Sequence, residues 1–160
     1  MADRDEVQVI LSKLASAPGR FAALLSSLED ADSVDTSDEG EWSPVRVFAH
    51  LRAANAILEP RILFVLVRDN PPLVGYDDTR WLEVARYDTL PVTESLESMR
   101  LHRAELIHAL RGISLEDWER TGTHEVRGPM TVLEIAKQLV EHEEDHLAQI
   151  ERSIGARRGR

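Results

Sequence analysis

The fold of this 160-residue chain is decided by the stretch Val140-Glu141-His142-Glu143-Glu144-Asp145-His146-Leu147-Ala148-Gln149-Ile150. The stretch lies in a run from Met130 to Ile154 that contains neither proline nor glycine, so we expect it to be helical. His142 and His146 are four residues apart, which places them one above the other on one face of a helix. Two imidazoles in this arrangement can bind one divalent metal ion from one side.

The histidine pair also fits other interpretations. Two histidines in an acidic stretch can be solvated surface residues or hydrogen-bond partners of neighbouring carboxylates. The stretch also matches the H-E-x-x-H motif of zinc proteases, but those enzymes need a third ligand further on, and no histidine follows His146. The extended motif needs glycine and histidine where this chain has Gln149 and Arg152, so we exclude this protease class. Glu143 points about 100° around the helix from His142 and does not by itself indicate catalysis.

Composition narrows the protein class. A chain of 160 residues is expected to form one domain over residues 1–160. The net charge of −10 argues against nucleic acid and anionic membranes as partners. There is no cysteine, which excludes disulfides, thiolate ligands and a cysteine nucleophile, so a metal would rest on His, Asp or Glu. No signal-peptide core and no membrane-spanning apolar run is visible, so we expect a cytoplasmic protein.

Four long runs with helical spacing of apolar residues predict an all-α four-helix bundle. Pro18 predicts either a kink or two abutting helices in the first run, and Pro60 predicts a kink in the second. Residues 30–42 and 121–130 are expected to be loops, and no segment alternates with period two for long enough to predict a strand. The four helices are predicted over residues 5–28, from Ser43-Pro44 to about Arg68, from Leu90-Pro91 to Gly112, and from the Thr131–Glu134 capping box to about Ile154.

Residues 71–90 form an unusually long connection. They contain Tyr76, Trp81 and Tyr87, three of the five Trp and Tyr residues of the chain. Connections of this length in compact domains are more often functional or partly helical than structureless. The aromatic rings would either wall a binding pocket or cover the end of the bundle, and the sequence leaves both possibilities open.

His50 is the best candidate for a third ligand. It lies two turns into the second predicted helix among apolar neighbours, which places it on the inward face. A lone inward histidine is more often a hydrogen-bonded core residue than a ligand, but here a histidine pair is available across the bundle. The remaining histidines lie on different faces of one helix or in a loop and are not expected to be ligands: His102, His108 and His124.

Together these motifs resemble the DinB-like superfamily, whose relatives include bacillithiol and mycothiol S-transferases and maleylpyruvate isomerases. The motifs are Trp42-Ser43 before the second helix, Ala49-His50-Leu51 within it, and His142-x-x-x-His146-Leu-Ala-Gln-Ile in the last helix. The resemblance covers nearly the whole chain, up to Ile150. It implies a DinB-type bundle with long connections, one divalent ion held by His50, His142 and His146, and a homodimer.

The chemistry expected at such a site depends on the ion. Three neutral imidazoles leave its charge uncompensated and its remaining positions open to water or a small-molecule substrate. The ion can lower the pKa of water or bind a thiol as thiolate. Because the related enzymes use low-molecular-weight thiols, we expect a metal-dependent S-transferase with a thiol cosubstrate; a metal-dependent hydrolase and a non-catalytic metal-binding stress-response protein are the alternatives. Imidazoles accept Zn, Ni, Mn or Fe, and the residues expected around the ion are Asn55, Gln138, Trp81 and Tyr87.

Overall fold

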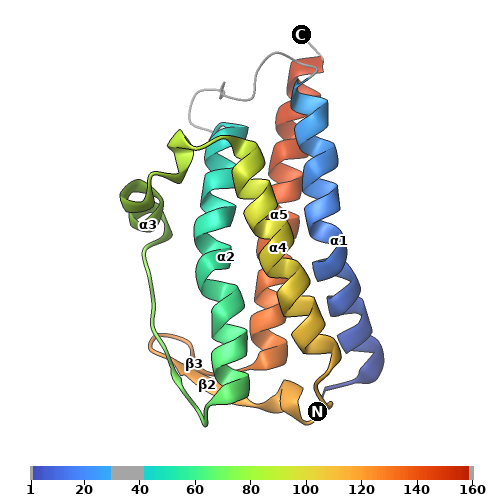
Figure 1. The fold of residues 1–160 in the computed structure, drawn as a ribbon, viewed down its shortest axis with the longest axis vertical. Coiled ribbons are helices and arrows are strands. Elements are labelled where there is room, and N and C mark those ends of the chain that lie inside the picture. The colour runs from blue at the N-terminus through green and yellow to red at the C-terminus, as the bar shows by residue number, and fades with distance from the viewer. Residues whose placement is uncertain (1, 30–41, 159–160) are drawn as a thin grey trace.

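The computed structural model describes residues 2–29 and 42–158, and most of them are helical (Figure 1). Four long helices form the bundle: α1 (Arg4–Glu29), α2 (Pro44–Val67), α4 (Val92–Arg111) and α5 (Val132–Arg158). The predicted four-helix bundle is confirmed, whereas the loop predicted before α2 lies outside the described residues except for Trp42. None of the described helices has the length and apolar character needed to cross a membrane.

Local sequence sets where α2 and α5 begin. The Ser43 hydroxyl accepts a hydrogen bond from the backbone N–H of Arg46 at 3.3 Å, and Pro44 occupies the first turn. Thr131 and Glu134 form a reciprocal capping box, because each side chain accepts from the other residue's backbone N–H, at 3.1 and 2.7 Å. These caps fix the residue at which each of the two helices that carry the predicted ligands begins.

Two apolar clusters fill the bundle, one toward each end. Both α1 and α2 pack against α4 and α5, so the four helices surround one core. The larger cluster includes Leu14, Ile62, Leu106 and Leu139, and the smaller one includes Phe21, Phe48, Leu147 and Ile150. The two clusters draw on different turns of each helix, and the buried polar residues Arg103 of α4 and Glu143 of α5 lie in the turns between them. This polar layer contains the residues considered below.

Pro18 lies inside α1, which is one continuous helix rather than two. Proline has no N–H, so the carbonyl of Leu14 four residues earlier loses its normal helical partner. Leu14 is fully buried, and an unpaired carbonyl there would be costly. Arg103 of α4 supplies the missing donor, with its Nη1 3.0 Å from the Leu14 oxygen. The interruption in α1 is therefore satisfied by a side chain from another helix.

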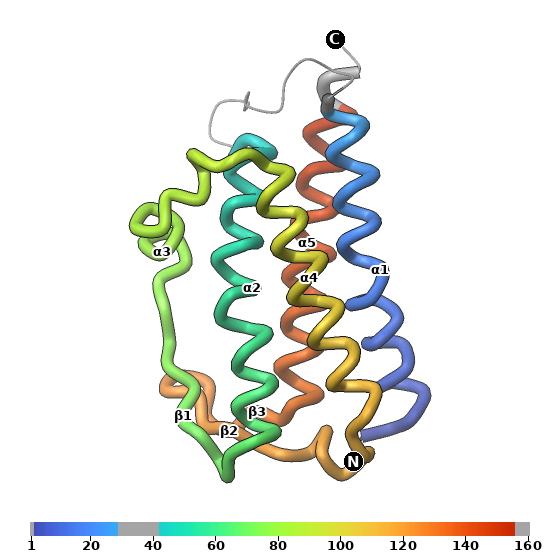
Figure 2. The backbone as a smooth tube through the Cα atoms, in the orientation of Figure 1, coloured from blue at the N-terminus to red at the C-terminus, as the bar shows by residue number. Residues whose placement is uncertain are grey.

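The prediction that residues 121–130 form a loop without strands is wrong. The strands β2 (Thr121–His124) and β3 (Gly128–Thr131) pair antiparallel, and β1 (Pro72–Leu73) joins β2 in parallel. Figure 2 shows the three strands at the end of the bundle where α2 ends and α5 begins. Strands of two to four residues are too short for a period-two pattern to be visible. Gly122 is required there, because a Cβ would lie 2.9 Å from a methyl carbon of Val65.

The long connection between α2 and α4 is partly helical, as predicted. It contains α3 (Asp78–Ala85) and a short 3₁₀ turn over Tyr87–Thr89. Asp77 caps α3 by accepting a hydrogen bond from the backbone N–H of Arg80 at 2.8 Å. Of the four long helices, only α2 makes extensive contacts with these two segments. The helix α3 therefore lies outside the bundle, beside α2 (Figure 1). The connection therefore covers the flank of the helix that carries His50.

Candidate metal centre

The structure brings the three predicted ligands together. His50 comes from α2, and His142 and His146 come from α5. The Nε2 atom of His142 lies 2.9 Å from Nε2 of His50 and 3.2 Å from Nε2 of His146. The three ring centroids are 4.6 to 5.0 Å apart. Among the residues that the structure describes, these histidines form the one group of three or more ligand side chains that could hold a metal ion.

These nitrogen contacts fit a metal ion better than a set of hydrogen bonds. A neutral imidazole nitrogen carries either one proton or one lone pair in the ring plane, so Nε2 of His142 cannot bond to both neighbours at once. Nitrogen ligands at the usual distance of about 2.0–2.1 Å from one ion lie roughly 2.9–3.4 Å from each other. The observed separations of 2.9 and 3.2 Å match that spacing. The donor set present therefore suits one divalent ion.

The three imidazoles are held in their neutral form. Burial lowers the pKa of His50 and of His142 to about 4, and the neighbouring histidines add to the effect. Burial also lowers the pKa of His146, against the opposing influence of its hydrogen bond with Gln149. A histidine must be neutral to bind a metal. The centre therefore has its ligands in the binding form at neutral pH.

Gln149 orients the ring of His146. The Nδ1 atom of His146 lies 2.8 Å from Oε1 of Gln149, and an amide oxygen can only accept a hydrogen bond. The proton is therefore on Nδ1, and the lone pair of Nε2 faces the other two histidines. From the sequence we expected Gln138 and Asn55 as polar groups around the ion and did not expect Gln149 there. Its position three residues after His146, on the same helical face, is the signal that could have found it.

The connection between α2 and α4 brings a carboxylate to the centre. Asp78, the first residue of α3, has its Oδ2 3.6 Å from Nδ1 of His50, and its charge tends to raise the pKa of all three histidines. The Asp78 side chain is 48% exposed, so it borders the centre from the solvent side. No sequence motif pointed to this residue, because its place depends on how the connection folds back on α2.

The aromatic residues proposed as walls of the centre have other contacts. Trp81 packs edge-on against Tyr76, with ring centroids 6.4 Å apart. The ring of Tyr87 is covered by the guanidinium of Arg52 at 4.7 Å. The ring that meets the centre is Trp42, whose centroid lies 5.1 Å from that of His50. The residue just before the cap of α2 thus closes one side of the histidine cluster.

Comparison with known proteins agrees with this geometry. Residues 13–150 match the model of the DinB superfamily. The chain belongs to the DinB superfamily. It is 22% identical over 149 residues to a Halalkalibacterium halodurans protein named "Putative metal-dependent hydrolase BH0277", covering 93% of this chain and 86% of that protein. An Oceanobacillus iheyensis protein named "Putative metal-dependent hydrolase OB0782" is 28% identical over 120 residues, covering 74% of this chain and 69% of that protein.

A solved structure shares the fold of this DinB protein. YfiT from Bacillus subtilis, described as a probable metal-dependent hydrolase with an unusual four-helix bundle topology, superimposes with a TM-score of 0.88. The match covers 99% of this chain and 91% of YfiT at 20% sequence identity. Similarity at this level of identity concerns the fold, and the fold expected from the resemblance is confirmed.

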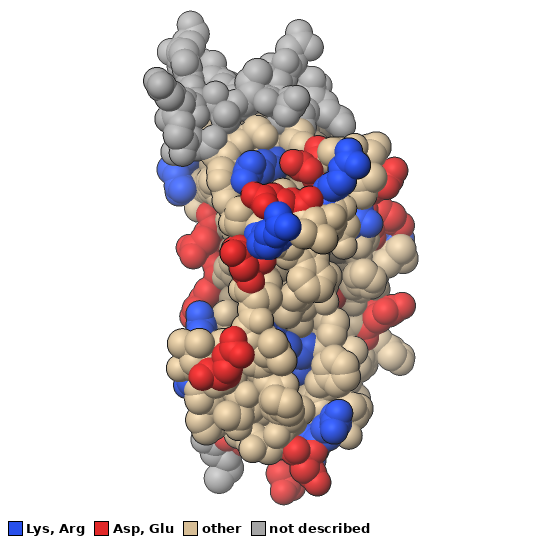
Figure 3. Space-filling view, turned by 90° about the vertical axis from the view of Figure 1, so that its left-hand side faces the viewer, with Lys and Arg blue, Asp and Glu red and all other residues tan. Residues whose placement is uncertain are grey.

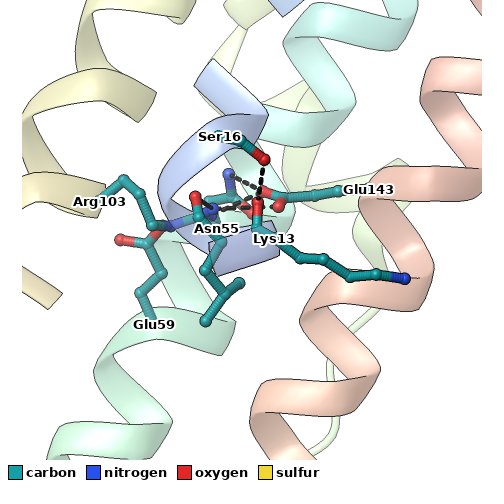
Figure 4. A network of polar contacts seen from close by, with 7 residues as sticks. Lys13, Ser16, Asn55, Glu59, Arg103 and Glu143 are labelled. Atoms are coloured by element: carbon teal, nitrogen blue, oxygen red, sulfur yellow. Dashed lines mark hydrogen bonds and ion pairs between the residues drawn. The ribbon is translucent and has the colours of Figure 1, made fainter. Parts of the chain in front are cut away.

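A buried ion cluster of the DinB bundle, drawn in Figure 4, includes Glu143, the residue that follows His142. Arg103 of α4 donates to both oxygens of Glu143 at 2.6 and 3.0 Å and twice to one oxygen of Glu59 at 2.9 and 3.1 Å. Asn55 also donates to Glu143, at 3.3 Å, and the four side chains belong to residues that are 2–4% exposed. The hydrogen bonds of Glu143 go to Arg103 and Asn55. The cluster therefore joins α2, α4 and α5 next to His142.

The charges in this cluster depend on one another. Burial alone would lower the pKa of Arg103, but its hydrogen bonds to Glu143 and Glu59 outweigh burial and raise it. Burial raises the pKa of Glu59, and the charge of Arg103 opposes that shift. Removing the guanidinium would leave two buried carboxylates without their cation. An uncompensated buried charge strongly destabilises the folded state.

We expect Arg103→Met to lower the free energy of unfolding by about 3–5 kcal/mol, because it leaves the buried carboxylates and the Leu14 carbonyl without their hydrogen-bond donor. Urea denaturation monitored by circular dichroism measures this change. Arg100→Met is the control, because Arg100 lies on the same helix and pairs with Glu97 on the exposed surface. Equal destabilisation by the two substitutions would contradict the assignment.

Proposed function

We propose that His50, His142 and His146 bind one divalent metal ion and that this protein is a metal-dependent hydrolase. The observation that carries the proposal is the convergence of three Nε2 atoms, with separations of 2.9 and 3.2 Å between His142 and its neighbours. The names of the curated relatives support the same reaction class. The homodimer implied by the superfamily resemblance stays a prediction.

Two residues beside the ion would have separate roles in the reaction. When bound, a divalent ion would supply a Lewis acid that lowers the pKa of a nucleophile and polarises an electrophile. Gln149 keeps the proton of His146 on Nδ1 and so keeps Nε2 available as a ligand. Oδ2 of Asp78 is the carboxylate oxygen beside the centre, and it can accept the proton that the nucleophile gives up. We therefore assign Asp78 as the general base.

Transfer to a low-molecular-weight thiol is the second candidate. The resemblance to bacillithiol and mycothiol S-transferases favours it, and a metal ion can hold a thiol as thiolate. The chain has no cysteine, so the thiol would be a cosubstrate, and Asp78 would accept its proton. The two reactions are distinguished by whether an electrophilic substrate is consumed in water alone or only when a small thiol is added.

The metal ligands are tested by metal analysis. Untagged protein should contain about one divalent ion per chain, and His50→Ala and His142→Ala should lose most of it because each removes one of three ligands. His108→Ala is the control, since His108 is an exposed residue of α4. Mass spectrometry of metal content measures the result. Unchanged metal content in both ligand variants would contradict the proposal.

Gln149→Leu tests the residue behind the ligand. Losing a hydrogen-bond partner of a ligating histidine typically weakens metal binding by about 10- to 100-fold. Competition with a chromophoric chelator measures the affinity. Gln8→Leu is the control, because Gln8 is an exposed glutamine of α1, and it should bind metal like the unaltered protein. If the two variants are indistinguishable, Gln149 does not orient His146.

Asp78→Asn tests the general base. The substitution should lower kcat about 100-fold or more, while metal content stays that of the unaltered protein. Screening esters and amides, with and without added thiols, first identifies the reaction. Asp88→Asn is the control, because Asp88 is an exposed carboxylate of the same connection. Full activity in Asp78→Asn would assign the proton transfer to another group.

A further inference from the structure

A second site lies on the flank of α2, away from the histidine cluster. A cleft of about 320 Å³ opens between α2 and the connection that follows it. Figure 3 shows this side of the molecule, whose middle is largely free of acidic and basic atoms. The cleft is lined mainly by apolar and aromatic side chains, including Ile57, Phe64, Leu73, Val74, Tyr76 and Trp81. A cleft of this size and composition suits a small apolar ligand.

Arg61 is the exception in this apolar lining. The residue is 8% exposed, and its guanidinium lies over the ring of Tyr76, 5.3 Å from the ring centroid. Its single hydrogen bond among the described residues goes to the backbone oxygen of Val74. No carboxylate of the described residues forms an ion pair with it, and burial lowers its pKa. A buried cation without a counter-ion is unusual, because desolvating a charge is costly unless it is paired.

The unused donors of Arg61 face the cleft. A guanidinium has five N–H donors, and Val74 accepts from one nitrogen. None of the Arg61 nitrogens belongs to the buried polar atoms that lack a partner, so the others are open to the space beside them. That space is the cleft, which Arg61 lines. The guanidinium therefore presents free donors to whatever occupies an otherwise apolar cavity.

The charges around Arg61 leave a net positive site. The hairpin between β2 and β3 places Glu125 and Arg127 near Arg61, and they act on its pKa in opposite directions. The Glu125 carboxylate lies against Gly75, where a Cβ would be 2.1 Å from Oε1. His124 has its pKa lowered by burial and by the charges of Arg61 and Arg127. Arg61, Arg127 and Glu125 together carry one net positive charge, in a protein whose total charge is −10.

We propose that this cleft binds a small molecule that carries a carboxylate on an apolar or aromatic body. The planar fork of Arg61 matches a carboxylate in two parallel hydrogen bonds. The rings of Tyr76 and Trp81 and the side chains of α2 would contact the apolar part. Arg61 follows His50 by eleven residues on α2, so it lies on nearly the same helical face but about 16 Å along the axis. The charged end of the cleft is therefore well separated from the histidine cluster, and the proposal goes beyond the metal-dependent reaction.

Matched probes test the proposal on the full-length protein. Isothermal titration calorimetry with 4-phenylbutyrate and with 4-phenylbutan-1-ol compares the same apolar body with and without the charge. We expect the carboxylate to bind at least tenfold more tightly than the alcohol. Arg61→Gln should abolish this preference while the alcohol binds as before, and Arg61→Lys should keep only part of it because lysine lacks the fork. Circular dichroism and a thermal melt establish that each variant is folded.

Two further variants make the result specific. Arg80→Gln removes an exposed arginine of α3 that pairs with Glu83, and it should leave the preference for the carboxylate intact. His142→Ala should also leave it intact, so that failure of the metal proposal does not affect this test. Equal binding of the two probes to the unaltered protein overturns the proposal. So does unchanged carboxylate affinity in Arg61→Lys and in Arg61→Gln, or its loss in Arg80→Gln.

Discussion

One buried guanidinium links all four helices of this bundle. Arg103 extends from α4 to a backbone carbonyl of α1, to Glu59 of α2 and to Glu143 of α5. A charge in this position is tolerated only when each partner stays in place, so it fixes the height and rotation of the helices at the middle of the bundle. Glu143 directly follows the ligand His142, in the turn of α5 that separates the two ligands. The contact that holds α5 against α4 therefore also determines which face of α5 meets His50.

The histidine cluster and the ion cluster around Arg103 lie where the two apolar clusters of the bundle meet. The apolar clusters bury side chains from every long helix above and below this polar layer, so the bundle does not depend on a metal ion for its core. Within the layer, Arg103 and its carboxylates occupy the inside, and the three histidines lie on the side that faces α3. The long connection then adds Asp78 at the centre and, further along α2, the wall of the cleft that contains Arg61. One irregular segment thus completes both proposed sites.

The sequence predicted what local patterns encode. Caps, proline positions and apolar spacing located the four helices, and the four-residue spacing of His142 and His146 placed both imidazoles on one face. His50 was named from its inward place opposite this pair, and the resemblance to a family supported the choice, since an inward histidine alone is ambiguous. Arg103, Asp78 and Gln149 were missed for different reasons. Arg103 and Asp78 contact residues that are distant in sequence, so spacing in the sequence carries no information about them. Gln149 lies three residues after His146, so the helical spacing from that ligand could have identified it.

X-ray absorption spectroscopy of the untagged, zinc-loaded protein shows whether the three histidines bind the ion, because it reports which atoms surround it. We expect a first shell of light ligands with the multiple-scattering signature of three imidazoles, at zinc–nitrogen distances of about 2.0–2.1 Å. A shell of oxygen atoms without imidazole scattering would contradict it. In that case the convergence of His50, His142 and His146 would be a feature of the polar layer alone.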